Sequence, residues 1–212
     1  IRLSLVGSEM CIRDSIVAAF KTEYPDVMVS IHSGNASAVH NWISSGFCDT
    51  GLAMLSGDSP GIQVEPVLTM NCVAVLPKGH RLTKLKKLKP ADFAGEPFIA
   101  FPSATPLREK IDAVFKAAKV ERQTVAEAGL GSSVCALVGA GLGVALINPL
   151  AAREEYEANG VEVRPFSPAV PVTVALLYPP YHTRTRLVSV FSRYAHQLMQ
   201  EEMADLKARP AR

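Results

Sequence analysis

The segment GSSVCALVGAGLGVALINP, residues 131–149, carries the signals of a helix followed by a strand. Val134–Ala140 consists of apolar and small residues that follow a pair of serines, a pattern typical of a helix after its first residues. Gly141 ends this helix, because glycine readily takes the left-handed conformation found after a helix. Val144–Asn148 is then a short apolar strand, and it stops at Pro149, which lacks a backbone N–H. A helix that leads into a buried strand indicates an α/β fold.

The same alternation extends in both directions along the chain. Ile16–Tyr24 carries apolar residues on one helical stripe, and Val27–His32 alternates as a strand. Val172–Tyr178 is a strand, and Thr185–Met203 is an amphipathic helix. The rhythm occurs twice with a break near residues 77–90, which predicts two lobes, each a mostly parallel sheet flanked by helices. Further strands are predicted at residues 49–55, 67–76, 97–101, 124–127 and 161–164, and further helices at residues 37–44 and 107–118. Ser37 is predicted to be the N-cap of the helix that ends at Ser44.

The composition is that of a soluble globular protein. Of the 212 residues, 48% are hydrophobic and 20% are charged, and no run of 18 apolar residues is present to span a membrane. The formal net charge of +2 is too small to predict nucleic-acid binding by this segment. The basic run Arg81–Lys89 is interpreted as a solvated face, with a contact surface as the alternative. The four cysteines lack the spacing of a metal site, so we expect reduced thiols and a cytoplasmic protein.

Motifs for catalysis and for cofactor binding are missing from the sequence. Gly139, Gly141 and Gly143 do not complete a dinucleotide fingerprint, and there is no P-loop or nucleophile elbow. The five histidines lie far apart and have no metal-ligand spacing. We therefore expect no enzyme, no cofactor and no metal.

Short polar residues recur where a predicted strand ends and a helix begins. Such positions bind carboxylates and other anions through free backbone N–H groups and the helix dipole. In open α/β sheets, ligands lie beyond the carboxyl ends of the strands. Ordinary helix capping explains any single one of these sets, but three sets from both lobes predict a small-molecule site in a cleft between the lobes. The candidate ligand-binding residues are Ser33, Gly34, Asn35, Ser37, Ser103, Thr105, Gly131, Ser132 and Ser133.

Four stretches resemble the effector-binding domain of LysR-type transcriptional regulators: YPDVMVSI (24–31), DTGLAM (49–54), VAVLPKGHRL (73–82) and SSVCALVGAGLGVALINP (132–149). The resemblance implies a periplasmic-binding-protein-like fold. Residues 1–76 and 177–212 would form the first lobe, and residues 77–176 the second. It also implies a winged helix-turn-helix domain N-terminal to this segment, through which the full protein would contact DNA.

The resemblance implies an effector-sensing domain that binds a small ligand between its lobes. Regulators of lysine biosynthesis and of opine catabolism are the most similar, so an amino-acid-like effector is expected, such as lysine, diaminopimelate or an opine. The family's effector contacts would fall at Ser8–Cys11, 33–37, 103–105 and 131–133, and Glu127 would either pair with a ligand ammonium or serve the structure. A homodimer or homotetramer is expected. An exported solute-binding protein of a transporter, with the same fold, is the alternative.

The segment SLVGSEMCIRDS, residues 4–15, does not fit the pattern of the family. It resembles a peptide translated from sequencing-adapter DNA, and divergent native sequence is the alternative. We therefore expect the native first effector loop to be missing from this chain and a regular helix to begin at Ile16.

Overall fold

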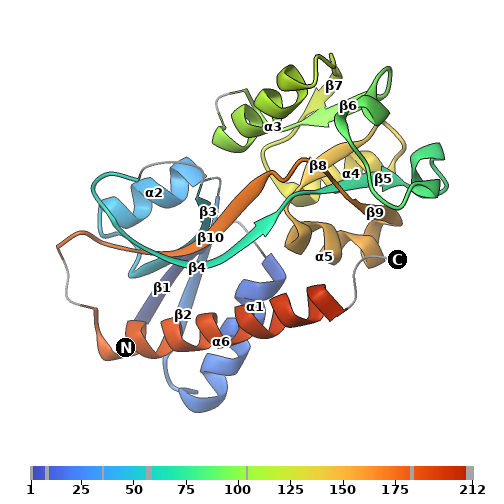
Figure 1. Cartoon of the computed structure of the whole chain (residues 1–212). Coiled ribbons are helices and arrows are strands. Elements are labelled where there is room, and N and C mark those ends of the chain that lie inside the picture. Colours follow the sequence, from blue (N-terminus) through green and yellow to red (C-terminus); the bar gives the residue numbers. More distant parts are fainter. Residues whose placement is uncertain are drawn as a thin grey trace. The chain divides into compact units, whose positions relative to one another are not determined.

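A computed structural model describes residues 2–7, 10–34, 36–55, 59–103, 105–181 and 184–208 (Figure 1). The chain divides into two compact units. Unit 1 contains Ile1–Thr69 and Thr173–Ala208, and unit 2 contains Met70–Val172. The chain passes from unit 1 to unit 2 within strand β4 (Gln63–Asn71) and returns within strand β10 (Pro171–Tyr178). The lobe boundaries predicted from the sequence, after residues 76 and 176, lie a few residues further along the chain at both crossings.

Unit 1 is built on a five-stranded sheet with the strand order β2-β1-β3-β10-β4. Strand β1 pairs in parallel with β2 and β3, whereas β10 runs antiparallel to β3. The α/β class is therefore confirmed, and β10 is a departure from the mostly parallel sheet that was predicted. The remaining elements of unit 1 are β1 (Arg2–Gly7), β2 (Met28–Ser33), β3 (Thr50–Leu55), α1 (Met10–Glu23), α2 (Ala36–Ser44) and α6 (Arg186–Ala208).

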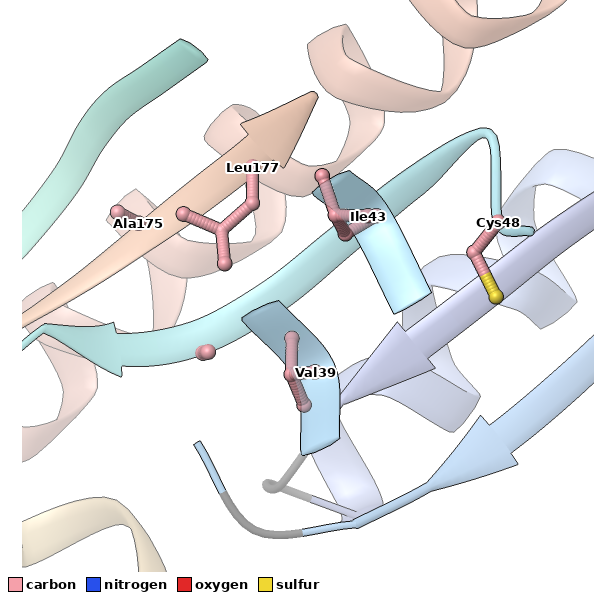
Figure 2. Packing of buried hydrophobic residues seen from close by; sticks show 6 residues of the cluster. Val39, Ile43, Cys48, Ala175 and Leu177 are labelled. Carbon is pink, nitrogen blue, oxygen red and sulfur yellow. The ribbon is translucent and has the colours of Figure 1, made fainter. Parts of the chain in front are cut away.

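Helices cover both faces of this sheet. Leu177 packs with Val39 and Ile43 of α2, together with Cys48 and Ala175, and all five side chains are buried (Figure 2). The next residue along β10, Tyr178, points to the other face and its hydroxyl bonds Ser192 of α6 at 2.8 Å. Successive side chains of a strand point to opposite faces, so α2 covers one face of the sheet and α6 the other.

The first helix begins earlier than its apolar stripe predicts. Helix α1 starts at Met10 rather than at Ile16, so half of the irregular segment 4–15 is helical. The part that packs is still the predicted stripe, because Ile16 and Phe20 are fully buried. The Phe20 ring meets Phe191 of α6 edge to face at a centroid distance of 6.0 Å.

Among the described residues, none of the helices combines the length and the apolar character that a membrane span requires.

Unit 2 contains a three-stranded sheet with the order β8-β5-β9 and a two-stranded sheet of β6 and β7. Strand β5 is antiparallel to both neighbours, whereas β6 and β7 are parallel. The predicted mostly parallel arrangement thus holds for β6 and β7 and fails for β5. The elements are β5 (Val73–Pro77), β6 (Pro97–Ala100), β7 (Gln123–Glu127), β8 (Ala145–Ile147), β9 (Val161–Pro165), α3 (Pro106–Ala117), α4 (Gly131–Gly139) and α5 (Pro149–Asn159), with 3₁₀ helices η1 (Arg81–Lys84) and η2 (Pro90–Phe93).

The two sheets of unit 2 meet at a glycine. The backbone N–H of Val144 donates to the Pro97 carbonyl at 2.8 Å, and the Ile99 N–H donates to the Val144 carbonyl at 2.9 Å. A Cβ on Gly143 would lie only 2.4 Å from the Pro97 carbonyl oxygen. Only glycine can therefore occupy position 143 while these hydrogen bonds form.

The predicted single strand at residues 67–76 is wrong, because it is two strands in different sheets. Cys72 separates β4 from β5, and its N–H donates to the Val170 carbonyl at 2.9 Å. Its side chain is buried, and burial raises the pKa of the thiol to about 12. An apolar run shows that a segment is buried, but not which sheet it joins.

Helix α5 was not predicted from the sequence, although its signals are present. Asn148 is the N-cap, and its side-chain oxygen accepts the Ala151 N–H at 2.9 Å. Pro149 occupies the first helical position, where a missing N–H costs nothing. Gly160 ends the helix in the left-handed conformation, with a φ of 62°. The sequence prediction took Pro149 only as the end of a strand.

Four phenylalanines form the centre of unit 2. The ring of Phe93 meets those of Phe98, Phe115 and Phe166 at centroid distances of 6.1, 5.6 and 5.8 Å, each edge to face. The guanidinium of Arg122 lies 4.8 Å from the ring centres of both Phe98 and Phe115. Aromatic pairs in this geometry add to the free energy gained from burying their surface.

Replacing Phe93 by alanine should destabilise unit 2 by about 3–5 kcal/mol, because it leaves a cavity among three rings. Lys116→Ala is a control at an exposed position of α3 and should change stability by less than about 0.5 kcal/mol. Urea denaturation of both variants measures the difference. A loss below about 1 kcal/mol in Phe93→Ala would contradict the central role of this ring.

Candidate functional site

In unit 1 the predicted site residues follow strand β2. Ser33 is the last residue of β2 and is paired in register with Gly7, the last residue of β1. The loops that leave both strands therefore start at the same edge of the sheet. Ser37 is exposed and is the second residue of α2, so its predicted role as the N-cap is wrong. Asn35 lies outside the described residues.

Gly34 connects this loop to an aromatic cluster. A Cβ at position 34 would lie 3.0 Å from the Trp42 ring and 3.0 Å from the Ala38 Cβ, so the helix packs directly on the glycine backbone. His32 adjoins Trp42 and Phe47 at ring-centroid distances of 6.0 and 5.1 Å. The buried Nε2 atom of His32 has no hydrogen-bond partner in the part of the chain that the structure describes.

The implied effector contacts at Ser8–Cys11 are only partly described. Residues 8 and 9 lie outside the described residues, and Met10 and Cys11 belong to the first turn of α1. The adapter-like reading of residues 4–15 stays a hypothesis.

In unit 2 the two predicted sets follow adjacent parallel strands. Ala100 at the end of β6 is paired with Glu127 at the end of β7, and the Ala128 N–H donates to the Ala100 carbonyl at 3.0 Å. The carboxyl ends of parallel neighbours meet at one edge of a sheet. The loop carrying Ser103 and Thr105 and the loop leading to α4 thus leave the same edge.

Helix α3 begins after a turn held by Thr105. This residue is the N-cap, with an extended backbone (φ −94°, ψ 133°), but its hydroxyl donates to the Pro102 carbonyl at 2.8 Å instead of accepting from the helix. Pro106 fills the first helical position. Ser103, in the turn before it, is exposed. The Thr105 side chain shapes the loop and leaves the helix amides uncapped.

Helix α4 also begins without a side-chain cap. Its N-cap is Leu130, which offers no acceptor to the first helical N–H groups. Gly131, Ser132 and Ser133 form the first turn, and Ser133 is exposed. A helix start with free amides and two hydroxyls is suited to bind a carboxylate.

Gly131 is required by packing. A Cβ at this position would lie 2.8 Å from the Cβ of Ala151, which is buried at the start of α5. The start of α4 therefore approaches α5 too closely for any side chain. The glycine fixes the position of the two serines that follow it.

Arg108 organises the edge of unit 2 and was missed by the sequence prediction. Its guanidinium donates to the Phe101 carbonyl at 2.8 Å, to Glu127 at 2.9 Å and to Asp112 at 2.8 Å. Glu127 is exposed but already paired with Arg108, which favours its structural role over pairing with a ligand ammonium. The one local signal was the spacing of Arg108 and Asp112, typical of an ion pair on a helix.

Arg122 is a second largely covered cation on this side of unit 2, with its side chain 8% exposed. It forms an ion pair with Asp112, and its Nη1 atom has no partner among the residues the structure describes. Burial, and then the charge of Arg108, lower the pKa of its guanidinium to about 10. The side chain remains charged at neutral pH and is held by the aromatic rings beneath it.

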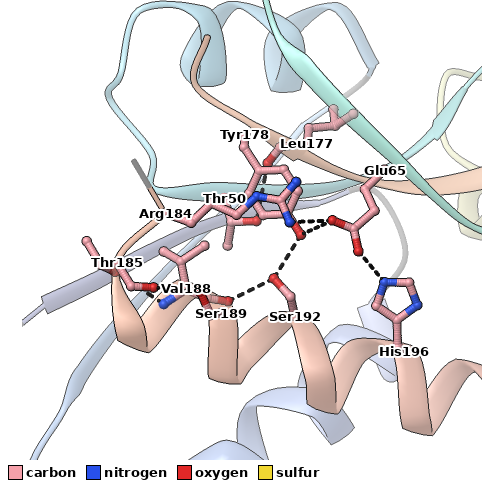
Figure 3. A network of polar contacts seen from close by, with 10 residues as sticks. All are labelled: Thr50, Glu65, Leu177, Tyr178, Arg184, Thr185, Val188, Ser189, Ser192 and His196. Carbon is pink, nitrogen blue, oxygen red and sulfur yellow. Dashed lines mark hydrogen bonds and ion pairs between the residues drawn. The ribbon is translucent and has the colours of Figure 1, made fainter. Parts of the chain in front are cut away.

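A polar network in unit 1 connects α6 to the sheet (Figure 3). The Glu65 carboxylate of β4 accepts from Arg184 at 2.5 Å, from His196 at 2.5 Å and from the Tyr178 hydroxyl at 3.2 Å. Beside it, a cavity of about 160 Å³ lies between the α2–β3 turn, the end of β10 and the start of α6. This cavity is at the amino end of β3, the opposite edge of the sheet from the predicted site residues.

Two α/β units, with helix starts at the carboxyl ends of their strands, are the architecture of a small-molecule-binding domain. Residues 13–200 match the LysR substrate binding domain family, so the chain belongs to this family.

Relatives and solved structures agree with this assignment. The chain is 34% identical over 193 residues to the transcriptional activator protein LysR of Escherichia coli, covering 91% of this chain and 62% of that protein. It is 34% identical over 176 residues to the regulatory protein NocR of Agrobacterium tumefaciens, covering 83% of this chain and 58% of that protein. The effector binding domain of QuiR in complex with shikimate superposes with a TM-score of 0.80 at 16% identity, covering 95% of this chain and 98% of that one. The chain thus spans about three-fifths of the length of these two relatives.

Replacing Gly131 by alanine should destabilise the protein by about 1–3 kcal/mol, because the new methyl group collides with Ala151. Gly129→Ala is the matched control two residues earlier, where an added Cβ meets nothing within 4 Å. The control should be neutral or stabilising by up to about 1 kcal/mol. Thermal denaturation of the pair tests this, and equal melting temperatures would contradict it.

The Glu65 network should make stability depend on acid pH. Burial raises the pKa of the Glu65 carboxyl, but hydrogen bonds from His196, Arg184 and Tyr178 outweigh it, so that the pKa lies below its ordinary value of 4.5. A lowered folded-state pKa contributes stability above pH 4.5, and this contribution is lost as the pH falls through the folded-state value. The difference in unfolding free energy between the native chain and Glu65→Gln should therefore shrink below pH 4.5 in denaturant titrations. A difference that stays constant from neutral to acid pH would show that the charge of Glu65 contributes nothing.

Proposed function

We propose that this chain is the effector-sensing domain of a bacterial DNA-binding transcriptional regulator and that it binds an amino-acid-like ligand. The observation that carries the proposal is the uncapped start of α4, with Ser132 and Ser133 in its first turn, beside the loop that follows β6. Free amides and hydroxyls at one sheet edge form a receptor for a carboxylate. The family assignment supports an effector-binding domain.

The proposed effector contacts are the candidate residues predicted from the sequence. They are Ser33, Gly34, Asn35 and Ser37 of unit 1, and Ser103, Thr105, Gly131, Ser132 and Ser133 of unit 2. Lysine, diaminopimelate or an opine is the proposed ligand class, because the chain resembles regulators of lysine biosynthesis and of opine catabolism. An effector can shift the regulator between two states only by its differential affinity for them.

The relatives favour this proposal over an exported solute-binding protein, because LysR and NocR are named as regulators of transcription or as regulatory proteins. They also give no reason to propose catalysis. A cytoplasmic location and contact with DNA through a separate domain of the full-length protein follow from the proposal.

Self-association is part of the proposal. Strand β2 is at the end of the five-stranded sheet as described, and it exposes Met28 and Ile31 at 62% and 40% of their surface. Strand β7 has one strand neighbour in the described sheets and exposes Val125 at 48%. Exposed apolar residues on edge strands favour pairing with another chain. A homodimer or homotetramer is therefore proposed.

A thermal-shift panel tests the ligand class. A ligand present at 100 times its dissociation constant stabilises the protein by about 2.7 kcal/mol, which is readily measured as a rise in melting temperature. Lysine, diaminopimelate and octopine should raise the melting temperature, and shikimate should not.

The residues are tested with matched double variants. Ser132→Ala with Ser133→Ala should abolish the ligand-induced shift, because the first turn of α4 loses both hydroxyls. Ser44→Ala with Ser45→Ala is the control, because it removes two exposed hydroxyls at the C-terminal end of α2 in unit 1. This double variant should keep the ligand-induced shift. A shift with shikimate alone would overturn the ligand class, and equal losses in both variants would overturn the residue assignment.

A further inference from the structure

Residues 78–96 connect β5 to β6 (Figure 1). This segment, the platform, contains η1 and η2 and is anchored to the rest of unit 2. Leu82 and Leu88 anchor it, because their side chains are 1% and 0% exposed. The Leu88 N–H donates to the Pro165 carbonyl at 2.8 Å, and the Leu88 carbonyl accepts from Ser167 at 2.8 Å. Two anchors on either side hold residues 83–87 in place on the surface.

Arg164 of β9 also holds the platform in place. The Arg164 guanidinium donates twice to the Thr83 carbonyl, at 2.9 and 2.7 Å. The same arginine is paired with Glu162 at 2.9 Å. The platform backbone at Thr83 is therefore hydrogen-bonded to a side chain of strand β9.

The acidic groups around the platform are already engaged. Glu96 pairs with Arg81 at 2.5 Å and with His80 at 3.2 Å. Glu162 is engaged by Arg164 and also accepts the Gly79 N–H at 3.1 Å. The Asp92 carboxylate accepts the Lys89 N–H at 2.8 Å.

Three lysines on the platform have no counter-ion in the part of the chain that the structure describes. Lys84, Lys86 and Lys87 are exposed, and none of them forms an ion pair with a described residue. The small net charge of the whole chain conceals this local concentration of positive charge. Like charges held close together repel one another, so a polyanion that binds there relieves repulsion as well as adding attraction.

We propose that Lys84, Lys86 and Lys87 bind the phosphate backbone of duplex DNA without regard to sequence. DNA is favoured over an acidic protein segment because the proposed function makes this chain part of a DNA-binding regulator, which would bring duplex DNA close to it. Duplex DNA carries one charge per about 1.7 Å of its axis, so several phosphates lie within reach of three adjacent lysines. The proposal rests on the proposed function as part of a DNA-binding regulator, and not on the identity of the effector.

Fluorescence anisotropy of a labelled random-sequence duplex, without effector, tests the proposal on this chain. Lys84→Glu with Lys87→Glu should weaken binding at low salt by about tenfold or more and reduce the slope of log affinity against log salt by about 2. Lys116→Glu with Lys119→Glu is the matched control, because it makes the same charge change at two exposed lysines elsewhere on unit 2. The control should retain most of the affinity and the slope.

Lysine acetylation followed by mass spectrometry gives a second measurement on the unmodified protein. DNA should protect Lys84, Lys86 and Lys87 and leave Lys116 and Lys119 reactive. The proposal would be overturned if both double variants lost the same DNA affinity, or if DNA protected all five lysines equally. Either result would show that only the overall charge of the protein matters. A poly-glutamate peptide that binds more tightly than DNA and displaces it would point to an acidic protein partner and overturn it as well. Because no effector is present, none of these outcomes bears on effector binding.

Discussion

Unit 2 depends on the approach of the Gly143 backbone to the carbonyl of Pro97. A side chain at this position would stand 2.4 Å from that oxygen, so its absence lets Val144 and Pro97 form a hydrogen bond. This bond joins the β6–β7 pair to the three-stranded sheet. It thereby sets where the carboxyl ends of β6 and β7 lie with respect to α4, and so where the candidate ligand-binding residues of unit 2 are displayed.

The features that could be predicted from the sequence are those determined by neighbours along the chain. Helix α4 and strand β8 follow from local signals, and both were predicted close to their observed bounds. The run at residues 67–76 was predicted as one strand, because apolar periodicity does not tell which sheet a strand joins. The start of α1 came out six residues late, because residues 10–15 lack an apolar stripe and still continue the helix.

In the candidate site too, features set by neighbouring residues could be predicted, and features set by distant residues could not. The small polar residues at the helix starts could be found, because capping and anion binding require the same residue types at the same places. The partners of Glu127 could not, because Arg108 reaches it across 19 positions of sequence. The reason for Gly131 is likewise non-local, since the atom that excludes a side chain belongs to Ala151. The sequence thus predicted which polar residues lie at the helix starts, but not the contacts that hold these helix starts in position.

The buried thiol of Cys72 has a kinetic consequence. With a pKa of about 12, on the order of one thiol in 100,000 is ionised at pH 7, and only the thiolate reacts with alkylating reagents. Cys72 sits where the chain turns from β4 into β5, just after it has entered unit 2. Alkylation of Cys72 therefore requires this turn to open to solvent. The rate of alkylation then reports how often the chain opens locally, at the point where it passes from one unit to the other.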